Sequence, residues 1–368
     1  MELKLNFTDL KFQYKELEKE IDTAIKEVLE STQFINGPQV KKLEEEVAKY
    51  SEAKYGIGVS SGTDALLLAL MAIDLQPGDE VITTPFTFIA TAEVISFLKA
   101  KPVFVDIDDN TYNIDASKIE EKITNRTKAI IPVHLYGQPA DMDEINAIAQ
   151  KHNLYVIEDA AQAIGAEYKG KKVCGLGDMG CISFFPSKNL GAYGDGGMIT
   201  TNSDKLRDKL LMLRNHGSAK KYVHQIIGTN ARLDTIQAAI LLVKIKHIEE
   251  WNNNRIKIAN RYSENLKDFA RVPFIKNDRK AIFHQYTIRT DRRDELQKYL
   301  LENGIPTAIH YPIPLHMQEA FQYLDYKEGD LPVSENLARE VISLPMFPEM
   351  TEEQQDLVIN EIKKFYGK

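Results

Sequence analysis

Cysteine and tryptophan are scarce in this sequence of 368 residues, which has one Trp and only two cysteines, Cys174 and Cys181. Neither cysteine belongs to a CxxC pair, and no histidine stands nearby to complete a set of metal ligands. We therefore expect no metal site and no disulfide framework. Two reduced, mostly buried thiols are typical of a cytoplasmic protein, so we predict a cytoplasmic location.

Long apolar runs are also missing. The longest, Ala65–Ile73, ends at Asp74 after nine residues, whereas about twenty are needed to cross a bilayer. The first twelve residues interleave charged with apolar side chains and contain no stretch typical of a signal peptide. We therefore expect no membrane-spanning segment and no membrane partner.

Positive charge is in deficit, because 46 Lys and Arg residues stand against 54 Asp and Glu residues, giving a net charge of −8. Such an acidic excess argues against a general nucleic-acid-binding protein. Hydrophobic residues make up 43% of the chain, which is enough for a full core without metal or disulfide support. At roughly 150 residues per domain, the length predicts two domains.

The first two thirds of the chain alternate between two kinds of segment. Short apolar runs rich in β-branched and aromatic residues occur at Tyr55–Val59, Val81–Thr84, Pro102–Asp106, Ala129–Val133, Leu154–Asp159, Ile182–Phe185 and Met198–Thr201. Amphipathic stretches of helical length lie in several of the gaps, at Ala65–Ile73, Asp141–His152 and Asp204–Arg214. Strands that alternate with helices predict an α/β layer with a largely parallel sheet.

The pattern changes after Asn230. A long helical pattern, Leu233–Asn265, is followed by a strand, a helix, a Pro-rich turn and closing helices, as in a smaller α+β unit. We predict a large domain over residues 1–250, including an N-terminal helical segment, and a small C-terminal α+β domain over 251–368. The N-terminal helix, predicted over Tyr14–Ser31, is expected to pack on the second domain or on a partner chain.

The first candidate site, Gly56–Asp64, closes a strand and opens an apolar helix. Free N–H groups and the helix dipole favour an anion there, so the turn is predicted to hold a phosphate. Its three glycines approximate a dinucleotide-binding fingerprint, but the last gap is one residue too long and no acid follows the next strand. Residues Gly58–Gly62 also match the GxSxG pattern of a nucleophile elbow, which leaves a serine hydrolase using Ser60 as an alternative. A plain tight turn is the third interpretation.

The second candidate site lies at the end of the apolar strand Leu154–Asp159. Side chains alternate along a strand, so Glu158 and Asp159 face opposite ways, and at most one points into the crevice at the carboxyl edge of the sheet. A carboxylate in that position needs a cation or several N–H donors to stay ionised. The alternative is that Asp159 merely caps the next helix.

The third candidate site is Lys188, which follows an aromatic strand and precedes a glycine-rich loop through Gly197. The apolar surroundings are expected to desolvate the ammonium and lower its pKa, as a Schiff-base lysine requires. A shift from about 10.4 to about 7.5 amounts to roughly 4 kcal/mol, within reach of burial plus a neighbouring cation. The alternative is an ordinary lysine of a surface loop.

All three segments place a polar group at the carboxyl end of a strand, where the groups can converge. Pyridoxal 5'-phosphate requires such a set: a helix N-terminus for its phosphate, an acid for its pyridine nitrogen and a lysine for its aldehyde. The sequence therefore predicts this cofactor.

Together with Asn215–Gly217 and Gly228–Asp234, these segments resemble the DegT-type nucleotide-sugar aminotransferases. The match extends from Asn36-Gly37 through His310-Tyr311-Pro312 to the final helices. The resemblance implies the fold type I architecture of pyridoxal phosphate enzymes, with a mostly parallel seven-stranded sheet in the large domain and a smaller α+β C-terminal domain.

The same resemblance implies roles for individual residues. Lys188 would form the Schiff base and carry protons, and Asp159 would pair with the pyridine nitrogen. Gln162 would bind the ring hydroxyl, and Phe88 would stack on the ring unless it is simply a core residue. The remaining residues implied at the cofactor are Gly62, Thr63, Asp64 and Ser183 near the phosphate, and Asn230, which would reach the phosphate of the neighbouring subunit. The implied substrate-binding residues are Arg232, His310 and Tyr311.

The implied reaction moves an amino group from glutamate to a nucleotide-linked keto sugar in an obligate homodimer with shared active sites. A branch of the family that has histidine in place of the lysine performs dehydration, so Lys188 favours transamination. The loop around Asp195 resembles members that aminate C3, and the preceding strand resembles enzymes of UDP-2-acetamido-3-keto sugars, including the uronic acid. Arg232 could grip a sugar carboxylate.

These features favour a role in cell-surface polysaccharide biosynthesis, such as that of lipopolysaccharide O-antigen. A dTDP-3-keto-6-deoxyhexose is the alternative substrate. A regulator that binds pyridoxal phosphate without catalysis is the further alternative.

Overall fold

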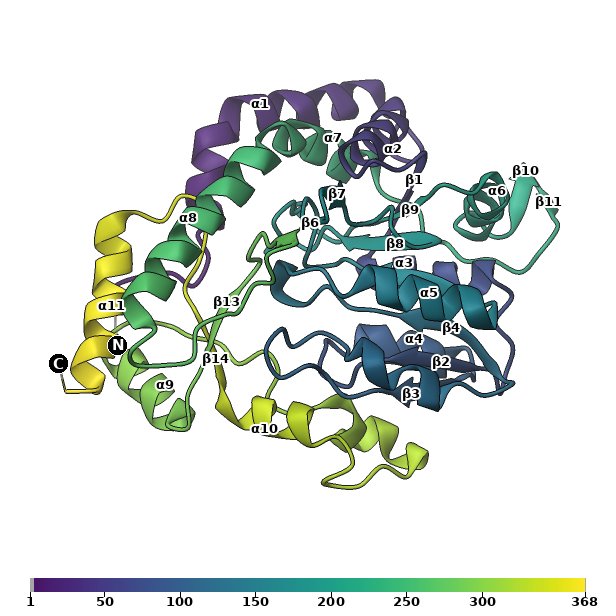
Figure 1. Cartoon of the computed structure of the whole chain (residues 1–368). Helices are drawn as coiled ribbons and strands as arrows, with labels where there is room; N and C mark the ends of the chain where they lie inside the picture. The colour runs from purple at the N-terminus through teal and green to yellow at the C-terminus, as the bar shows by residue number, and fades with distance from the viewer. Residues whose placement is uncertain (1–2, 368) are drawn as a thin grey trace.

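A seven-stranded sheet forms the centre of the computed structural model, which describes residues 3–367 (Figure 1). The strand order is β1-β9-β8-β5-β4-β2-β3. Every neighbouring pair is parallel except the two pairs that involve β9. The bounds are β1 Tyr55–Val59, β2 Glu80–Thr83, β3 Lys101–Phe104, β4 Thr127–Ile131, β5 Tyr155–Asp159, β8 Met179–Ser183 and β9 Gly197–Thr201. Each of the seven predicted runs overlaps a strand of this sheet, although β8 lies mostly before the predicted run Ile182–Phe185. The predicted fold class is confirmed.

Helices cover both faces of the sheet (Figure 1). On one face lie α3 (Gly62–Ala72), α4 (Ala90–Phe97) and α6 (Asp204–Leu213), and on the other lies α5 (Met142–His152). Strand β4 shows why both faces need cover: Ala129 and Ile131 join the core under α3, whereas Ile130 joins the core under α5. A strand that is apolar on both sides is typical of a parallel sheet between two helical layers.

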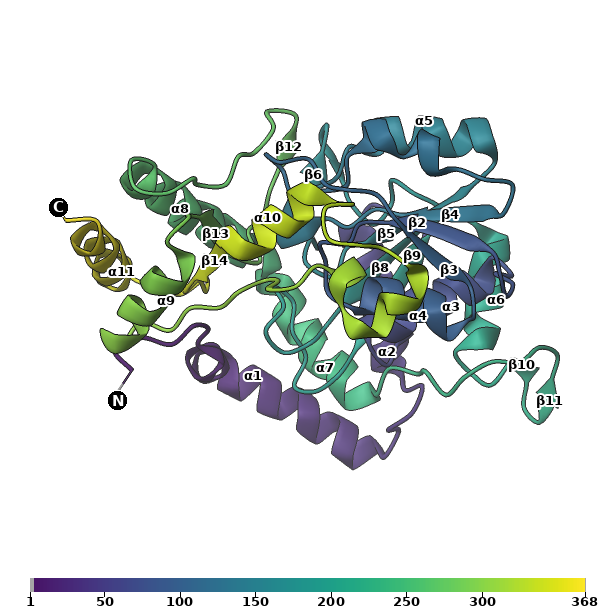
Figure 2. The same ribbon diagram turned by 90° about the horizontal axis from the view of Figure 1, so that it is seen from below.

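Three helices, α1 (Leu10–Ser31), α2 (Pro38–Tyr50) and α7 (Thr235–Lys244), form a further layer beyond β1 (Figures 1 and 2). α1 packs on α7 and buries Leu17 and Ile21 there. Because α7 lies within the predicted large domain, this contact is not with residues 251–368; packing of the helix on a partner chain stays a prediction. The helix also starts four residues earlier than predicted, because the Asp9 side chain caps it by accepting from Phe12 N.

The C-terminal part has its own core between α8 (Ile248–Leu266), α9 (Arg293–Glu302), α11 (Glu352–Phe365) and the antiparallel pair β13 (Tyr286–Arg289) and β14 (Val341–Leu344). The predicted helix Leu233–Asn265 is interrupted by one 3-10 turn, η4 (Ile245–His247), between α7 and α8. Leu5, from the start of the chain, joins this C-terminal core. The division at residue 250 stays a proposal, which the separate core supports.

The remaining elements are short. A hairpin of β10 (Ser218–Lys220) and β11 (Val223–His224) projects from the body beside α6 (Figure 2). The others are α10 Pro332–Glu340, β6 Glu167–Tyr168, β7 Lys171–Lys172, β12 Arg279–Lys280, η1 Ala116–Lys118, η2 Glu120–Lys122, η3 Leu135–Gly137, η5 Leu315–Met317 and η6 Glu319–Leu324. Within residues 3–367, no helix combines the length and apolar character needed to cross a membrane.

Glu158 and Asp159 face opposite sides of β5, as the alternation of the strand predicts. Glu158 is fully buried, and each of its carboxylate oxygens accepts two hydrogen bonds. The donors are Nε2 of His134 and the backbone N–H groups of residues 174, 176 and 177. Ala140 N donates to Nδ1 of His134, so the imidazole hydrogen must be on Nε2. Glu158 thus fixes a loop beneath the sheet.

We expect Glu158→Gln to lower the free energy of unfolding by about 3 kcal/mol. Whichever way the glutamine amide is turned, its NH2 group replaces one carboxylate oxygen and faces the two donors that were hydrogen-bonded to that oxygen. Urea denaturation measures the loss. Glu121→Gln, at an exposed side chain, is the matched control and should be neutral; equal stability of the two variants would contradict the account.

Candidate active site

A cavity of about 360 Å³ opens beside the carboxyl ends of β1, β5 and β8. It is lined both by the sheet domain and by segments from the C-terminal part. Nine of the residues predicted from the sequence line it: Gly62, Thr63, Phe88, Asp159, Gln162, Ser183, Lys188, His310 and Tyr311. Residues more than two hundred positions apart in the sequence thus meet in one place.

One end of the cavity is the N-terminus of α3. Ser61 caps this helix, and its Oγ accepts from Asp64 N at 3.0 Å. Gly62 and Thr63 come before Asp64 in the first turn of the helix. Their backbone N–H groups are among those that have no acceptor within a helix. A Cβ on Gly62 would lie 2.7 Å from the Cβ of Ser183, so only glycine lets the helix end approach this serine. The result is a concave cluster of amides and hydroxyls suited to a phosphate.

Asp64 does not line this cavity, contrary to the expectation. Its Oδ2 accepts hydrogen bonds from the hydroxyls of Ser60 and Ser61. Ser60 is also outside the cavity lining, and among residues 3–367 no histidine is hydrogen-bonded to its hydroxyl. A serine nucleophile requires a base, so the geometry does not favour the nucleophile elbow.

Asp159 is a buried acid in the lining of the same cavity. Its Oδ2 accepts from Thr91 Oγ1 at 2.8 Å and its Oδ1 from Ala161 N at 3.2 Å. Burial raises the pKa of this carboxyl despite both hydrogen bonds and the charge of Lys188. A buried carboxylate with so few donors favours a cationic partner in the cavity. No helix follows Asp159, so the capping alternative is wrong.

Gln162 and Tyr311 form one side of the cavity. The Gln162 side chain accepts from Tyr136 N at 2.7 Å and donates to the Tyr311 hydroxyl at 3.2 Å, which fixes its orientation. Phe88 is 55% exposed, so it is not a core residue. Its ring lies 6.3 Å from that of Tyr311, centroid to centroid. Aromatic faces are thus available to a flat ring bound here.

Lys188 follows β8 in the loop that crosses the cavity. Burial lowers the pKa of its ammonium from 10.5 to about 8, and the negative charge of Asp159 opposes this shift. The direction and size agree with the sequence prediction, but no neighbouring cation contributes, so desolvation alone is the cause. The loop is held from behind by Lys244, whose ammonium donates to the carbonyl of Gly191.

Sequence motifs did not identify several lining residues, among them Thr91, His284 and Gln285. His284 enters the cavity because its segment pairs with the turn at η3. His284 N donates to the carbonyl of Tyr136, and Ile282 N donates to that of Gly137. Because this pairing is long-range and irregular, no local sequence motif predicts it. The hydroxyl of Thr91, at the start of α4, could have been suspected only from its position near Phe88.

Two predicted residues, Asn230 and Arg232, are not among those lining the cavity of this chain. Asn230 is exposed and forms an isolated bridge with Asn215. Arg232 donates from Nη1 to Asn215 Oδ1 at 2.8 Å, so its guanidinium is directed away from the cavity. The expectation that Arg232 binds the substrate stays a prediction. Asn230 was predicted to act on a neighbouring subunit, which stays a prediction.

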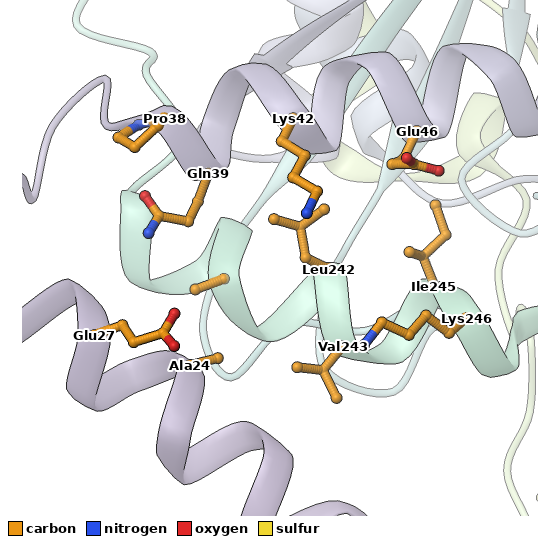
Figure 3. A pocket seen from close by; sticks show the side chains of 11 residues that line it. Ala24, Glu27, Pro38, Gln39, Lys42, Glu46, Leu242, Val243, Ile245 and Lys246 are labelled. Carbon is orange, nitrogen blue, oxygen red and sulfur yellow. The ribbon is translucent and has the colours of Figure 1, made fainter.

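Another hollow, of about 460 Å³, lies between α1, α2 and α7 (Figure 3). Its lining consists of small and aliphatic side chains with charged residues at its edges, such as Glu27, Lys42 and Lys246. It contains none of the predicted site residues. In the described part of the chain, no group of three or more His, Cys, Asp or Glu side chains is placed to hold a metal ion.

The cavity residues fit pyridoxal phosphate. Amides and hydroxyls at the α3 end suit its phosphate, Asp159 suits a protonated pyridine nitrogen, and Lys188 has the lowered pKa that a reactive amine needs. Each group comes from a different loop at the same edge of the sheet.

Comparisons with known proteins agree with this fit. The model of the DegT/DnrJ/EryC1/StrS aminotransferase family matches residues 15–363. The "UDP-2-acetamido-2-deoxy-3-oxo-D-glucuronate aminotransferase" of Pseudomonas aeruginosa is 50% identical over 94% of this chain and 95% of its own length. A "pleiotropic regulatory protein" of Geobacillus stearothermophilus is 55% identical over 97% of both chains. The solved structure of S. venezuelae DesV has a TM-score of 0.97 at 41% identity, and all of both chains is covered.

We expect the amine of Lys188 to react with acetic anhydride along a pH curve with its midpoint near 8 in the cofactor-free folded chain, because burial lowers its pKa to about 8. In the urea-unfolded chain the midpoint should return to about 10.4. Quantitative mass spectrometry of the Lys188 peptide gives both curves. Coincident midpoints in the folded and unfolded chains would show that the ammonium is not desolvated.

Proposed function

Because the chain belongs to the DegT/DnrJ/EryC1/StrS aminotransferase family of pyridoxal phosphate-dependent sugar aminotransferases, we propose that it transfers an amino group from glutamate to a nucleotide-linked keto sugar. Solved relatives hold pyridoxal phosphate or its amine form, and this is the cofactor of the chain. The observation that carries the proposal is the shared cavity of Lys188, Asp159 and the N-terminus of α3.

Different residues of the cavity bind different parts of the cofactor. When bound, the cofactor supplies an electron sink and a temporary carrier for the amino group. Thr63 and Ser183, with the amides of residues 62 and 63, hold its phosphate; Asp159 hydrogen-bonds its pyridine nitrogen and keeps it protonated. Gln162, oriented by Tyr136 and Tyr311, binds its ring hydroxyl.

Lys188 is the group that moves the proton. To take the proton from the α-carbon of glutamate its amine must be neutral, and a pKa of about 8 makes a substantial neutral fraction available near neutral pH. An unburied lysine with a pKa of about 10.4 would be almost entirely protonated there. Activity that depends on neutral Lys188 therefore rises with pH through about 8.

We propose C3 of a UDP-2-acetamido-3-keto sugar, or of its uronic acid, as the site that receives the amine. The name of the 50% identical relative from P. aeruginosa includes such a substrate, and Asp195 lines the same cavity as Lys188. The product would serve cell-surface polysaccharide synthesis, such as that of lipopolysaccharide O-antigen. A dTDP-3-keto-6-deoxyhexose is the alternative, because "dTDP-3-amino-3,6-dideoxy-alpha-D-galactopyranose transaminase" is the name of a 48% identical relative.

We propose that the enzyme is a cytoplasmic homodimer with shared active sites. The projecting β10–β11 hairpin exposes apolar side chains, with Tyr222 84% and Ile227 88% accessible, as is typical of a surface that another chain covers. The hairpin connects Asn215 to Asn230 and could bring Asn230 to a neighbouring cavity. Both cysteines are free and buried, which suits a reducing compartment.

A regulatory role is the second candidate, because the 55% identical relative from G. stearothermophilus is named a regulatory protein. A regulator of this fold would bind the cofactor without turning over an amino donor. The intact set of Lys188, Asp159 and Gln162 in one cavity favours catalysis.

The visible spectrum of the purified protein before and after glutamate tests the proposed reaction. We expect absorbance of the lysine-bound cofactor, its loss on adding glutamate, and its return on adding the keto sugar. Lys188→Ala should show neither the absorbance nor turnover. If glutamate leaves the absorbance unchanged, the regulatory role is favoured. If protein supplied with the cofactor shows no absorbance of the lysine-bound form, both candidates are rejected.

Asp159→Asn should lower kcat by about 10- to 100-fold, the equivalent of the roughly 1.5–3 kcal/mol of a charged hydrogen bond. Asp178→Asn, which alters an exposed aspartate outside the cavity, is the control for an Asp-to-Asn change. The sugar specificity is read from kcat/KM with a panel of UDP- and dTDP-linked 3-keto and 4-keto sugars. A preference for 4-keto sugars would contradict amination at C3.

Mixing two inactive variants tests the shared site. In heterodimers of Lys188→Ala and Asn230→Ala chains, one of the two sites has both natural residues if Asn230 acts across the interface. Random exchange then restores roughly a quarter of the wild-type sites, as binomial mixing of two chains requires. If Asn230 acts within its own subunit, no site is complete and no activity returns.

A further inference from the structure

His284 has a ring whose hydrogen position is determined by the surrounding side chains. It is 8% exposed and lines the cavity together with Lys188. Its Nδ1 lies 3.1 Å from Oδ1 of Asn189, the residue next to Lys188 in the chain. Asn189 is itself buried and connects to Asn252 in α8.

The direction of this hydrogen-bond chain is set at its far end by backbone carbonyls, which can only accept. Asn252 Nδ2 donates to the carbonyl of Ile164 at 3.0 Å, so Asn252 Oδ1 is left to accept from Asn189 Nδ2 at 2.8 Å. A second anchor agrees, because Asn189 Nδ2 also lies 3.4 Å from the carbonyl of Ile282.

With its NH2 group committed to those acceptors, Asn189 presents only its carbonyl oxygen to His284. The hydrogen between the two must therefore be on Nδ1 of the imidazole. In the neutral ring this leaves Nε2 without a hydrogen, as an acceptor. Among residues 3–367, none is hydrogen-bonded to Nε2.

The charged groups around the ring keep it neutral. Burial lowers the pKa of His284, and the positive charges of Lys188 and Arg255 lower it further. Arg255 donates to the carbonyl of His284 at 3.2 Å. His310 lies near as well, and its own pKa is lowered to about 4 by burial and by Lys188. Asp159 and Asp195 are the acidic groups that line this cavity.

Lys188 offers the complementary group. Its ammonium is buried and hydrogen-bonded to no residue between 3 and 367, so its N–H groups lack an acceptor from the protein. A donor and an acceptor, each without a hydrogen-bond partner among residues 3–367, thus line the same cavity. A hydrogen bond between them would satisfy both groups.

We propose that His284 is a positioning residue for Lys188: Asn252 and Asn189 fix its ring as the Nδ1–H form, and Nε2 accepts a hydrogen bond from an N–H group of the neutral Lys188 amine. The bond directs the amine toward the α-carbon of the substrate and leaves its lone pair free. Proton transfer falls steeply when donor and acceptor are misplaced, by up to about 10²-fold for an ångström. The inference deepens the proposed aminotransferase reaction and depends on it.

Two substitutions separate the two ring nitrogens. In His284→Asn, the amide NH2 can replace Nδ1 and keep the bond to Asn189, but the acceptor facing Lys188 is lost. In His284→Gln, the amide oxygen can replace Nε2 as acceptor, but the bond to Asn189 is lost. His152→Asn, at a partly exposed histidine paired with Glu120, is the control for a His-to-Asn change.

We expect His284→Asn to lower kcat of the glutamate half-reaction by about 10²-fold with KM nearly unchanged. Its isotope effect with α-deuterated glutamate should rise, because proton transfer becomes rate-limiting. His284→Gln should retain activity within about tenfold of the wild type, and the control should match the wild type. Wild-type kinetics in His284→Asn, or a larger loss in His284→Gln, would overturn the inference.

The hydrogen position is measured without any catalysis. In protein labelled with ¹⁵N at histidine, long-range NMR correlations should identify His284 as the neutral Nδ1–H form, and its signals are assigned by their loss in His284→Gln or, if this variant does not fold, in His284→Asn. An Nε2–H ring would overturn the inference, and one folded variant at this position is enough for the assignment. A wild-type enzyme without any half-reaction would instead reject the proposed function on which the inference rests.

Discussion

Desolvation of a lysine ammonium opposite a buried carboxylate is the constraint on which the site depends. Lys188 and Asp159 line one cavity, and burial moves their pKa values in opposite directions, down for the ammonium and up for the carboxyl. Burial disfavours the charged form of each group, whereas their mutual attraction favours it. The amine therefore has a substantial neutral, reactive fraction. The buried acid can interact favourably with a cationic group bound in the cavity.

The fold supplies this arrangement by bringing loops from several strands to one edge of a sheet. β1 leads into the capped N-terminus of α3, β5 ends in Asp159, and β8 leads to Lys188. The C-terminal part then closes the cavity with His284, His310 and Tyr311. Each contributing loop is anchored from behind, by Ser61 at the helix cap, by Thr91 at the acid and by Asn189 beside the lysine. Positioning therefore comes from polar contacts within the protein.

Local sequence patterns were sufficient for the sheet and for the residues that follow its strands. The alternation along β5 predicted that Glu158 and Asp159 face opposite ways, and the apolar shoulder before Lys188 predicted its lowered pKa. The site residues that motifs could not identify depend on long-range packing. His284 reaches the cavity through backbone pairing with residues 136 and 137. Arg232 was assigned by resemblance, yet its guanidinium bonds Asn215 instead of lining this cavity. The start of the chain was equally unpredictable, because Leu5 packs in the C-terminal core.

Borohydride reduction followed by peptide mass spectrometry tests the central claim most directly. Reduction fixes pyridoxal phosphate covalently to the lysine that binds it. We predict that the added mass is found on the peptide that contains Lys188 and that Asp159→Asn weakens cofactor binding without moving the label. A label on another lysine, such as the buried Lys244, or no label on protein saturated with the cofactor, would contradict the account.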